Sequence, residues 1–496
     1  MNVRLDTRIR PGAVAASVVS AVLCGLCCLG YAPWHVVVPA LLTVFAVVYA
    51  RRGLQGSSDA QPIRNGGRFL WAGLAAIAVG VILFIRKADA FENPQFWAED
   101  AFLFNSARQD GLASHLKTHS HGQVFLAQRT IAYFGRFLPV VYTPYFYNFA
   151  ALVVTLLVAA YIARARIDGL NPYVRACMAL VPVAVYGTGE VYMTLVNIHW
   201  ILAPLLLVIA MERDPQTRWG RIVLLLTMIV LALTGPFIVF LWPLFLWRAW
   251  IRGTPFSRAL FAVIVPCVVQ QLFTIRATRT GTIATAANTA GTVALTNPHW
   301  SGFIGRNYVG NLFMGPLVEK LDVAPMVYVV LLLLVYGVIL LYVLRRRDFE
   351  VAVCLITSLA TLGVGAYIHR YTPRSVDLPG HRYYFVPQIC IGWAFLIMAA
   401  RSRGKWLALP VAGLLAMAAA SLAHFTCKPL DDLHWAKTSR AIGGPKPCVI
   451  FVNPLVLRQD VSKEYLESLV SAKQINVATF SVVYHPDPSV KVLDPP

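Results

Sequence analysis

The chain has 496 residues, of which 58% are hydrophobic and 13% charged, and its formal net charge is +20. A soluble domain carries about a quarter charged residues, so this composition excludes an ordinary soluble protein. The apolar residues also fall in blocks of roughly 15 to 25, about the length that crosses the hydrocarbon core of a bilayer. We therefore predict an all-α polytopic membrane protein. The basic residues form no stripe with interleaved aromatic residues, so we expect no nucleic-acid partner.

The N-terminus combines Arg4, Arg8 and Arg10 with an apolar run from Ala13 to Ala32, a pattern shared with signal peptides. A second apolar block, Pro33 to Ala50, follows without a convincing small-residue cleavage site between the two. We therefore expect a signal anchor that remains in the membrane. Hydropathy along the chain predicts about 13 transmembrane helices, at about 13–31, 33–50, 68–85, 138–163, 174–188, 191–211, 221–234, 236–250, 258–275, 325–344, 350–367, 385–400 and 406–422.

The short loops on one side of these spans are rich in arginine, which is typical of cytoplasmic loops. The basic residues of these loops are Arg51, Arg52, Arg64, Arg68, Arg164, Arg166, Arg175, Arg213, Arg218, Arg221, Arg248, Arg252, Arg258, Arg345, Arg346, Arg347, Arg401, Arg403 and Lys405. We predict a cytoplasmic N-terminus and an extracytoplasmic C-terminus in a bacterial inner (cytoplasmic) membrane. The transmembrane domain then covers residues 1–422, with outer loops at about 86–137, 276–324 and 368–384, and a small extracytoplasmic tail covers 423–496.

The first outer loop opens with two adjacent carboxylates, Glu99 and Asp100, which follow Phe96 and Trp97. A carboxylate in such surroundings can have a raised pKa suited to general base catalysis, or the pair can hold a divalent cation through its oxygens. A structural alternative is that Asp100 caps a helix from Ala101 to Asp110, with Gly111 as its stop. Both interpretations remain open.

Three histidines in the same loop, His115, His119 and His121, form an H-x3-H-x-H pattern. Imidazoles four residues apart on a helix can share a metal ion. Ser120, Gly122 and Gln123 indicate a loop instead, where the histidines would be polar or sugar-contacting residues. A metal site is the weaker interpretation, and the sequence requires no cofactor beyond an optional divalent cation.

A polar segment interrupts two apolar spans near the outer surface. It contains Glu190 and ends with Asn197, His199 and Trp200. Polar groups at membrane depth are costly and tend to mark sites, and a non-helical break needs surrounding protein or water. A hairpin turn is the simpler alternative, but this segment is more polar than a turn requires. We predict sugar or acceptor contacts from Glu190, Asn197, His199 and Trp200.

Basic residues on the outer side run against the usual charge bias and need another cause. They are Arg276, Arg279, Arg306, Lys320, Arg370, Arg374, His381 and Arg382. Arginine binds phosphate oxygens through two parallel hydrogen bonds, so a lipid-linked phosphate is a natural partner, with ordinary anionic headgroups as the alternative. We predict phosphate or donor contacts from Arg306, Arg370, Arg374 and Arg382.

The tail has two β-branched runs, Val449 to Val452 and Val477 to Tyr484, around a helical pattern from Ser462 to Ala472. We predict a small α/β unit. Cys427 and Cys448 both fall in this tail, where an oxidising compartment permits a disulfide; two buried thiols are the alternative.

The combination resembles the C-type glycosyltransferase (GT-C) superfamily of polytopic membrane enzymes, which place an acidic residue or pair in the first large outer loop. The chain is more narrowly similar to bacterial proteins of that type that share F-W-A-E-D (Phe96 to Asp100), N-x-x-W (Asn197 to Trp200), R-Y (Arg382-Tyr383) and an N-P step (Asn453-Pro454). Two extra N-terminal spans, Ala101 where many relatives have glycine, and the small tail depart from this pattern.

The resemblance implies a GT-C-like fold and inverting transfer of a sugar from a polyprenyl-phosphate donor to a glycan or lipid acceptor of the cell envelope. Asp100 or Glu99 would then be the base, and the partners would be the donor, the acceptor and membrane lipids. A transporter or flippase of lipid-linked saccharide is the alternative from another class, although the spans contain almost no charge. A polymerase or ligase of O-antigen type is a third possibility.

Overall fold

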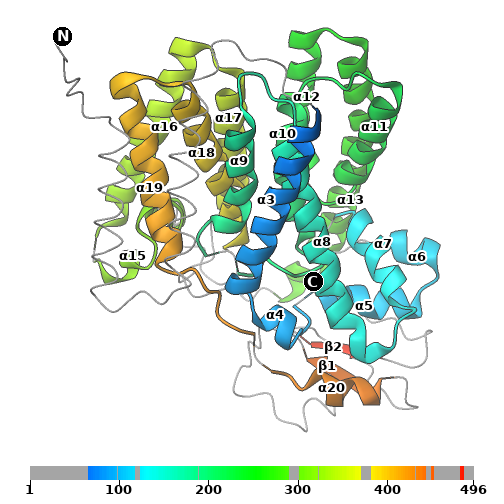
Figure 1. Cartoon of the computed structure of the whole chain (residues 1–496). Helices are drawn as coiled ribbons and strands as arrows, with labels where there is room; N and C mark the ends of the chain where they lie inside the picture. Colours follow the sequence, from blue (N-terminus) through cyan, green and yellow to red (C-terminus); the bar gives the residue numbers. More distant parts are fainter. Residues whose placement is uncertain are drawn as a thin grey trace, which may run out of the picture.

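Long α-helices that lie side by side make up most of the structure, a computed structural model (Figure 1). It describes residues 65–97, 99–117, 123–187, 189–289, 301–321, 323–369, 381–430, 432–442, 448–451 and 481–484. The long helices are α3 (Asn65–Arg86), α8 (Thr143–Arg164), α9 (Pro172–Ala184), α10 (Ile198–Met211), α11 (Arg218–Ala232), α12 (Phe237–Arg252), α13 (Pro255–Thr289), α16 (Pro325–Arg346), α17 (Phe349–His369), α18 (Arg382–Arg401) and α19 (Ala408–Leu422).

Short elements gather mainly at one end of these helices, at the bottom of Figure 1, which we call the site end. They are α4 (Asp89–Glu92), α5 (Asp100–Gln109), α6 (Leu112–Lys117), α7 (Leu126–Gly135), η1 (Val140–Tyr142), α20 (Trp435–Thr438), η4 (Ser439–Ala441), β1 (Cys448–Phe451) and β2 (Ser481–Tyr484). The remaining short elements are a π-helix η2 (Ser301–Gly310), α14 (Asn311–Met314), α15 (Leu317–Lys320) and η3 (Gly404–Leu407).

The predicted spans from 68–85 onward each overlap one of the long helices, although α10 begins seven residues later than the predicted span 191–211, and the first two predicted spans lie outside the described residues. Within the described residues, five helices are long and apolar enough to cross a membrane: Phe69–Arg86, Val140–Arg164, Pro255–Ala277, Met326–Arg346 and Arg382–Arg401. Four shorter apolar helices accompany them. The chain therefore has the helices of a membrane protein, and the total of 13 spans stays a prediction.

Arginine-rich loops of the described part of the chain meet at the end of the helices opposite the site end. The backbone N–H of Arg213 donates to the carbonyl of Arg166 at 2.8 Å. Arg252 donates to the carbonyl of Met211 at 2.7 Å, and Arg401 donates to the carbonyl of Asp168 at 2.6 Å. Loops that are far apart in the sequence thus lie together, as the predicted topology requires of loops on one side of a membrane.

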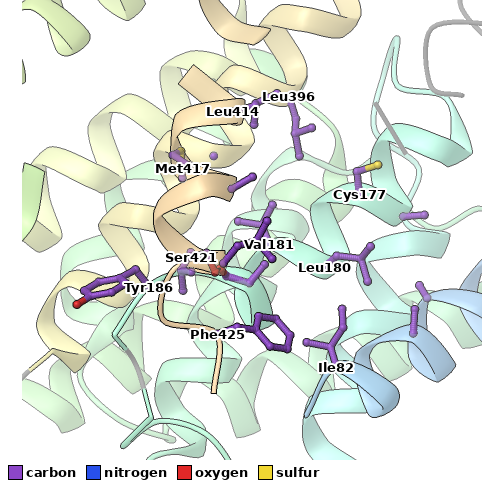
Figure 2. A pocket seen from close by; sticks show the side chains of 18 of the residues that line it. Ile82, Cys177, Leu180, Val181, Tyr186, Leu396, Leu414, Met417, Ser421 and Phe425 are labelled. Atoms are coloured by element: carbon purple, nitrogen blue, oxygen red, sulfur yellow. The ribbon is translucent and has the colours of Figure 1, made fainter. Parts of the chain in front are cut away.

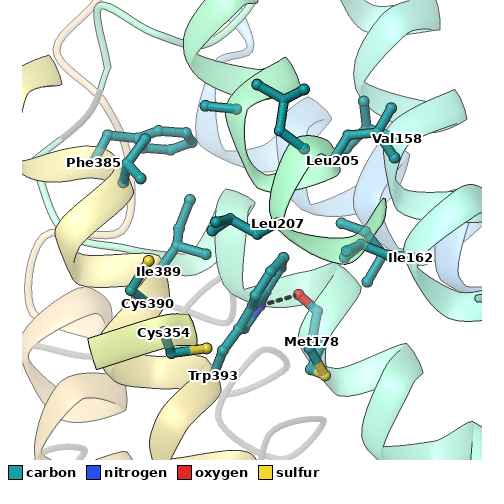
Figure 3. Packing of buried hydrophobic residues seen from close by; sticks show 14 of the residues in the cluster. Val158, Ile162, Met178, Leu205, Leu207, Cys354, Phe385, Ile389, Cys390 and Trp393 are labelled. Atoms are coloured by element: carbon teal, nitrogen blue, oxygen red, sulfur yellow. Dashed lines mark hydrogen bonds between the residues drawn. The ribbon is translucent and has the colours of Figure 1, made fainter. Parts of the chain in front are cut away.

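An apolar core joins α8, α9, α10 and α18 and sets their relative positions (Figure 3). Trp393 of α18 is fully buried, and its indole N–H donates to the carbonyl of Met178 of α9 at 2.8 Å. Buried indole N–H groups need such a partner, because leaving the donor unpaired costs free energy. This contact holds α18 against α9, so the first turn of α18 lies near the end of α9.

A non-helical break separates α9 from α10, where the sequence predicts an interruption of two apolar spans. α9 ends at Ala184, because Val185 has an extended backbone and Gly187 a φ of 72°. α10 begins at Ile198, directly after Asn197. The break is buried within the protein at all but a few positions, which is where a membrane protein tolerates irregular backbone.

The tail packs on the site end. β1 pairs antiparallel with β2, with Cys448 opposite Tyr484, and β2 packs against α5. Trp435 of α20 places its ring centroid 4.7 Å from that of Phe96. Cys427 is a free thiol, so the disulfide to Cys448 is not formed in this structure. The predicted helix from Ser462 to Ala472 lies outside the described residues.

Arg248 is buried at 0% exposure and forms an ion pair with Asp214 at 2.6 Å. Its guanidinium also donates to the carbonyl of Ile209. Asp214 is 17% exposed, so Arg248→Met should cost less than the about 3–5 kcal/mol of a fully buried pair but should still clearly lower the thermal unfolding temperature in detergent. Arg213→Met is the matched control, because the Arg213–Asp168 pair is exposed and exposed pairs stabilise little. If both substitutions lowered the unfolding temperature equally, burial of the Arg248 side chain would not add to the stabilisation by its ion pair.

Candidate functional site

The break between α9 and α10 is held by side chains rather than by regular backbone hydrogen bonds. Asn197 and Thr194 both donate to the carbonyl of Glu190, at 2.7 and 2.9 Å. Met193 has a φ of 59°, an uncommon conformation for a residue other than glycine. Such strained positions persist only where their surroundings hold them in place. The side chain of Asn197, predicted to contact sugar, thus supports the loop that carries Glu190.

The carboxylate of Glu190 binds the first residue of α18. The backbone N–H of Arg382 donates to Glu190 Oε1 at 2.6 Å, and the guanidinium lies 3.8 Å from Oε2. A carboxylate at a helix N-terminus is favourable because the first N–H groups have no partner within the helix and the helix dipole is positive there. Glu190 is 5% exposed, so this contact is shielded from water.

The guanidinium of Arg382 also faces Glu99, so two carboxylates flank one arginine. Its second terminal nitrogen lies 3.8 Å from Glu99 Oε1. Both separations exceed hydrogen-bond length, so charge rather than tight hydrogen bonding holds the guanidinium. The Arg382 and Glu99 side chains are 23% and 16% exposed. The three charged groups come from distant parts of the chain, and we call them the Glu99–Arg382–Glu190 cluster.

Asp100, the first residue of α5, points away from this cluster into the protein. Its Oδ1 accepts from the backbone N–H of Val196 at 2.7 Å, and its Oδ2 accepts from that of Trp97 at 3.3 Å. Asp100 is 1% exposed, and burial raises the pKa of its carboxyl to about 7, against the two hydrogen bonds that lower it. The predicted N-cap role was one residue off: Glu99 occupies the cap position, and Asp100 bonds back to Trp97.

His199 and Trp200 are buried next to the start of α18 and do not form an open surface for ligand contacts. The Trp200 ring packs 5.4 Å from Tyr383 and 4.9 Å from Phe237. His199 Nδ1 lies 2.8 Å from the carbonyl of Val196. Both residues are less than a tenth exposed. The sugar contacts predicted for these two residues stay a prediction, and what the structure shows is that they pack against neighbouring rings and support the break.

The histidine motif does not present a metal site at His115. His115 lies in the short helix α6 rather than in a loop, and it is fully buried. Its Nδ1 lies 2.8 Å from Ser106 Oγ, and its Nε2 lies 2.9 Å from the carbonyl of Arg129, so both ring nitrogens are engaged. Burial lowers the pKa of His115 to about 4. His119 and His121 lie outside the described residues.

No group of three or more His, Cys, Asp or Glu side chains with metal-site geometry occurs in the described part of the chain. Glu99 and Asp100 point to different partners, so the adjacent carboxylates do not share a face toward a cation. Arg306 is exposed on η2. Arg370 and Arg374 lie outside the described residues. Of the four predicted phosphate contacts, the structure therefore brings Arg382 to the acidic residues.

Arg86 is a supporting residue that sequence reasoning did not single out. It is 1% exposed at the end of α3 and donates to the carbonyls of Val183 and Val185 at 2.8 and 2.7 Å. Its own carbonyl accepts from the backbone N–H of Cys427 at 2.8 Å. The available signal was an arginine directly after an apolar run on the outer side, where the charge bias disfavours one.

Comparison of the chain with protein-family models, with curated proteins and with solved structures gives no match.

Asp100→Asn tests the protonation of the buried carboxyl. The unfolded chain has an aspartate pKa of about 3.9, so between about pH 4 and pH 7 the folded protein binds a proton that the unfolded chain releases. Stability should therefore fall as the pH rises through this range, by up to about 1.4 kcal/mol per pH unit, and level off above it. Asparagine does not titrate, so the variant should lack this slope in thermal unfolding.

The matched control is Asp110→Asn at the other end of α5, where the backbone carbonyl rather than the carboxylate accepts from Arg136. This variant should keep the wild-type pH dependence. If Asp100→Asn kept it as well, Asp100 would be ionised in the folded protein.

Proposed function

We propose that the chain is a membrane glycosyltransferase of GT-C type. It transfers a sugar from a polyprenyl-phosphate donor to a glycan or lipid acceptor of the cell envelope. The observation that carries this proposal is the Glu99–Arg382–Glu190 cluster at the site end of the membrane helices. It combines a partly exposed carboxylate with a guanidinium, which are the two groups that transfer from a phosphate donor requires.

The reaction uses the carboxylate as a base and the guanidinium as an anion site. Glu99 accepts the proton of the acceptor hydroxyl as its oxygen forms a bond to the anomeric carbon. The bond from that carbon to the phosphate oxygen breaks, and its electron pair leaves with the phosphate. Arg382 stabilises this departing negative charge. Attack from the face opposite the phosphate inverts the anomeric centre.

Exposure and hydrogen bonding favour Glu99 over Asp100 as the base. Glu99 is 16% exposed and lies beside Arg382, whereas Asp100 is fully buried and accepts two backbone hydrogen bonds. A general base must reach the hydroxyl that it deprotonates, directly or through one water. Asp100 therefore acts as the residue that positions the loop on which Glu99 lies.

Charge supports an extracytoplasmic site end. The arginine-rich loops among the described residues lie at the opposite end of the helices, and short arginine-rich loops stay in the cytoplasm. The donor is membrane-bound through its prenyl chain, so a site at the end of membrane helices suits it. In this arrangement the protein lies in the bacterial inner membrane with about 13 spans.

Glu99→Gln should reduce sugar transfer by about 10²- to 10⁴-fold, because the amide cannot accept the acceptor proton. The assay uses membranes that contain the variant, a polyprenyl-phosphate sugar and envelope acceptor, with mass spectrometry of the glycans from a complemented deletion strain. Asp100→Asn should retain most activity per folded molecule. Glu92→Gln is the matched control, because Glu92 is exposed in the same loop.

Full activity in Glu99→Gln would end the assignment of Glu99 as the base, and full activity in both variants would exclude the acidic pair altogether. A transporter would give a different result: deletion would accumulate a lipid-linked intermediate on the cytoplasmic side, while transfer chemistry in the membranes stayed intact. A polymerase or ligase would instead change the length or attachment of the glycan chain.

Reporter fusions test the proposed orientation. A reporter that is active only outside the cytoplasm should be active after Pro496 and inactive after Arg347, which follows α16 in an arginine-rich loop. Inactivity after Pro496 would show that the number of spans is wrong by one.

A further inference from the structure

An elongated apolar slot runs between α3, α9 and α19 (Figure 2). Its lining follows one stripe on each helix. On α3 the stripe extends from Trp71 to Ile82, and on α9 from Tyr173 to Ala184. The third stripe extends from Leu414 to Phe425. Each stripe covers twelve residues, and the stripes on α3 and α9, which are helical throughout, extend about 16 Å along the helix axis.

The shape and chemistry of the slot fit a hydrocarbon chain. Its volume is about 300 Å³, and its lining residues extend over about three turns of each of α3 and α9. That volume is at the small end of ligand sites, too little for a sugar and its chain together. Nearly all lining side chains are apolar, and a cavity of this kind does not hold ordered water.

The slot lies beside the membrane-facing side of α3. Leu74 lines it and is 45% exposed, and its neighbours Phe69 and Ile77 are each 67% exposed. These exposed apolar side chains belong to a helix long and apolar enough to cross a membrane, so they suit contact with lipid tails. A chain could therefore enter the slot sideways from the bilayer.

Polar groups are concentrated at the site end of the slot. Tyr186 lines this end, and its ring centroid lies 6.3 Å from that of His381 and 5.8 Å from that of His424. His381 directly precedes Arg382 of the cluster. An anionic headgroup at this end would lie among groups that can donate hydrogen bonds or carry positive charge.

From the shape of the slot and the groups at its end, we propose that it binds the hydrocarbon chain of a polyprenyl phosphate, with the phosphate beside Tyr186, His381 and His424. The choice of polyprenyl phosphate over another anionic lipid rests on the proposed function. The inference that an anionic lipid binds here rests only on the slot and the groups at its end.

Photolabelling of the full chain in phosphatidylcholine nanodiscs tests the proposal. The probe is farnesyl phosphate with a diazirine at the end of its chain. We expect mass spectrometry to find the label on peptides of α3, α9 and α19, and unlabelled farnesyl phosphate to compete about tenfold better than farnesol. A diazirine-labelled phosphatidylcholine that labels the same residues equally well would show bulk lipid in the slot and overturn the proposal.

Ala176→Trp fills the slot from α9 and should reduce labelling at least tenfold. Ala160→Trp is the matched control, because Ala160 is a partly exposed alanine of α8 that does not line the slot. Thermal unfolding shows whether each variant folds; if Ala176→Trp does not, label mapping in the wild type decides the question alone.

The headgroup position has its own variants. Replacement of His381 and His424 by alanine should remove most of the preference for phosphate over alcohol, whereas His434→Ala, at an exposed position beside Asp432, should not. An unchanged preference in the double variant would show that the phosphate lies elsewhere.

Two outcomes separate this inference from the proposed function. Glu99→Gln should lose transfer and keep labelling. The wild-type protein could be labelled in the slot and yet show no transfer activity. That result would support the lipid site and refute the proposed transferase function. Cross-linking of Cys177 in the slot to residues 13–50, with exclusion of the probe, would show that the chain's own N-terminal segment fills the slot and would overturn the inference.

Discussion

Backbone groups that leave a helix inside a membrane protein must find hydrogen-bond partners, because no water is available there. The break between α9 and α10 meets this constraint through side chains from other elements. Arg86 of α3 binds the carbonyls of Val183 and Val185, and Ser421 of α19 binds that of Ala184. Asp100 of α5 binds the backbone N–H of Val196. The break is thus the point at which four distant parts of the chain are joined.

The same requirement produces the charged cluster. Glu190 can lie buried in the break because Asn197 and Thr194 hold its backbone and the start of α18 neutralises its carboxylate. The start of α18 is in turn positioned by the contact of Trp393 with α9. Arg382 therefore has a defined place, and its guanidinium can meet Glu99 from the loop after α4. The buried charges are paired, which keeps the cost of desolvating them low.

The sequence predicted the helices well, because a run of about 20 apolar residues has few alternatives to a membrane helix. It also predicted the break, since Glu190, Asn197 and His199 are too polar for continuous helices at membrane depth. The sugar or acceptor contacts predicted for these residues stay predictions, and the structure adds that Asn197 and His199 each contact a backbone carbonyl of the break. Which carbonyl a buried Asn or His binds depends on the loops around it, and loop geometry is not encoded in a local pattern of residue types.

The histidine motif is a second case in which the sequence pattern did not show which partners a side chain has. A spacing of four residues matches two metal ligands on a helix, and His115 does lie on a helix. Its two nitrogens are nonetheless occupied by Ser106 and the carbonyl of Arg129, a partner supplied by α7. Arg86 was not predicted as a supporting residue because its partners are the backbone carbonyls of Val183 and Val185. Every residue has a backbone carbonyl, so residue types do not show which carbonyls an arginine binds.

Glu99 and Asp100 show how far neighbours in sequence can differ in chemistry. At the start of a helix, successive side chains diverge by about 100° around the axis, and Glu99 and Asp100 point to different partners here. Asp100 turns inward and is committed to two backbone N–H groups, which fix the loop. Glu99 turns toward Arg382 and remains partly exposed. This adjacent acidic pair therefore divides into one buried carboxylate that binds backbone N–H groups and one carboxylate that faces an arginine, and the surroundings of each rather than its residue type decide which is which.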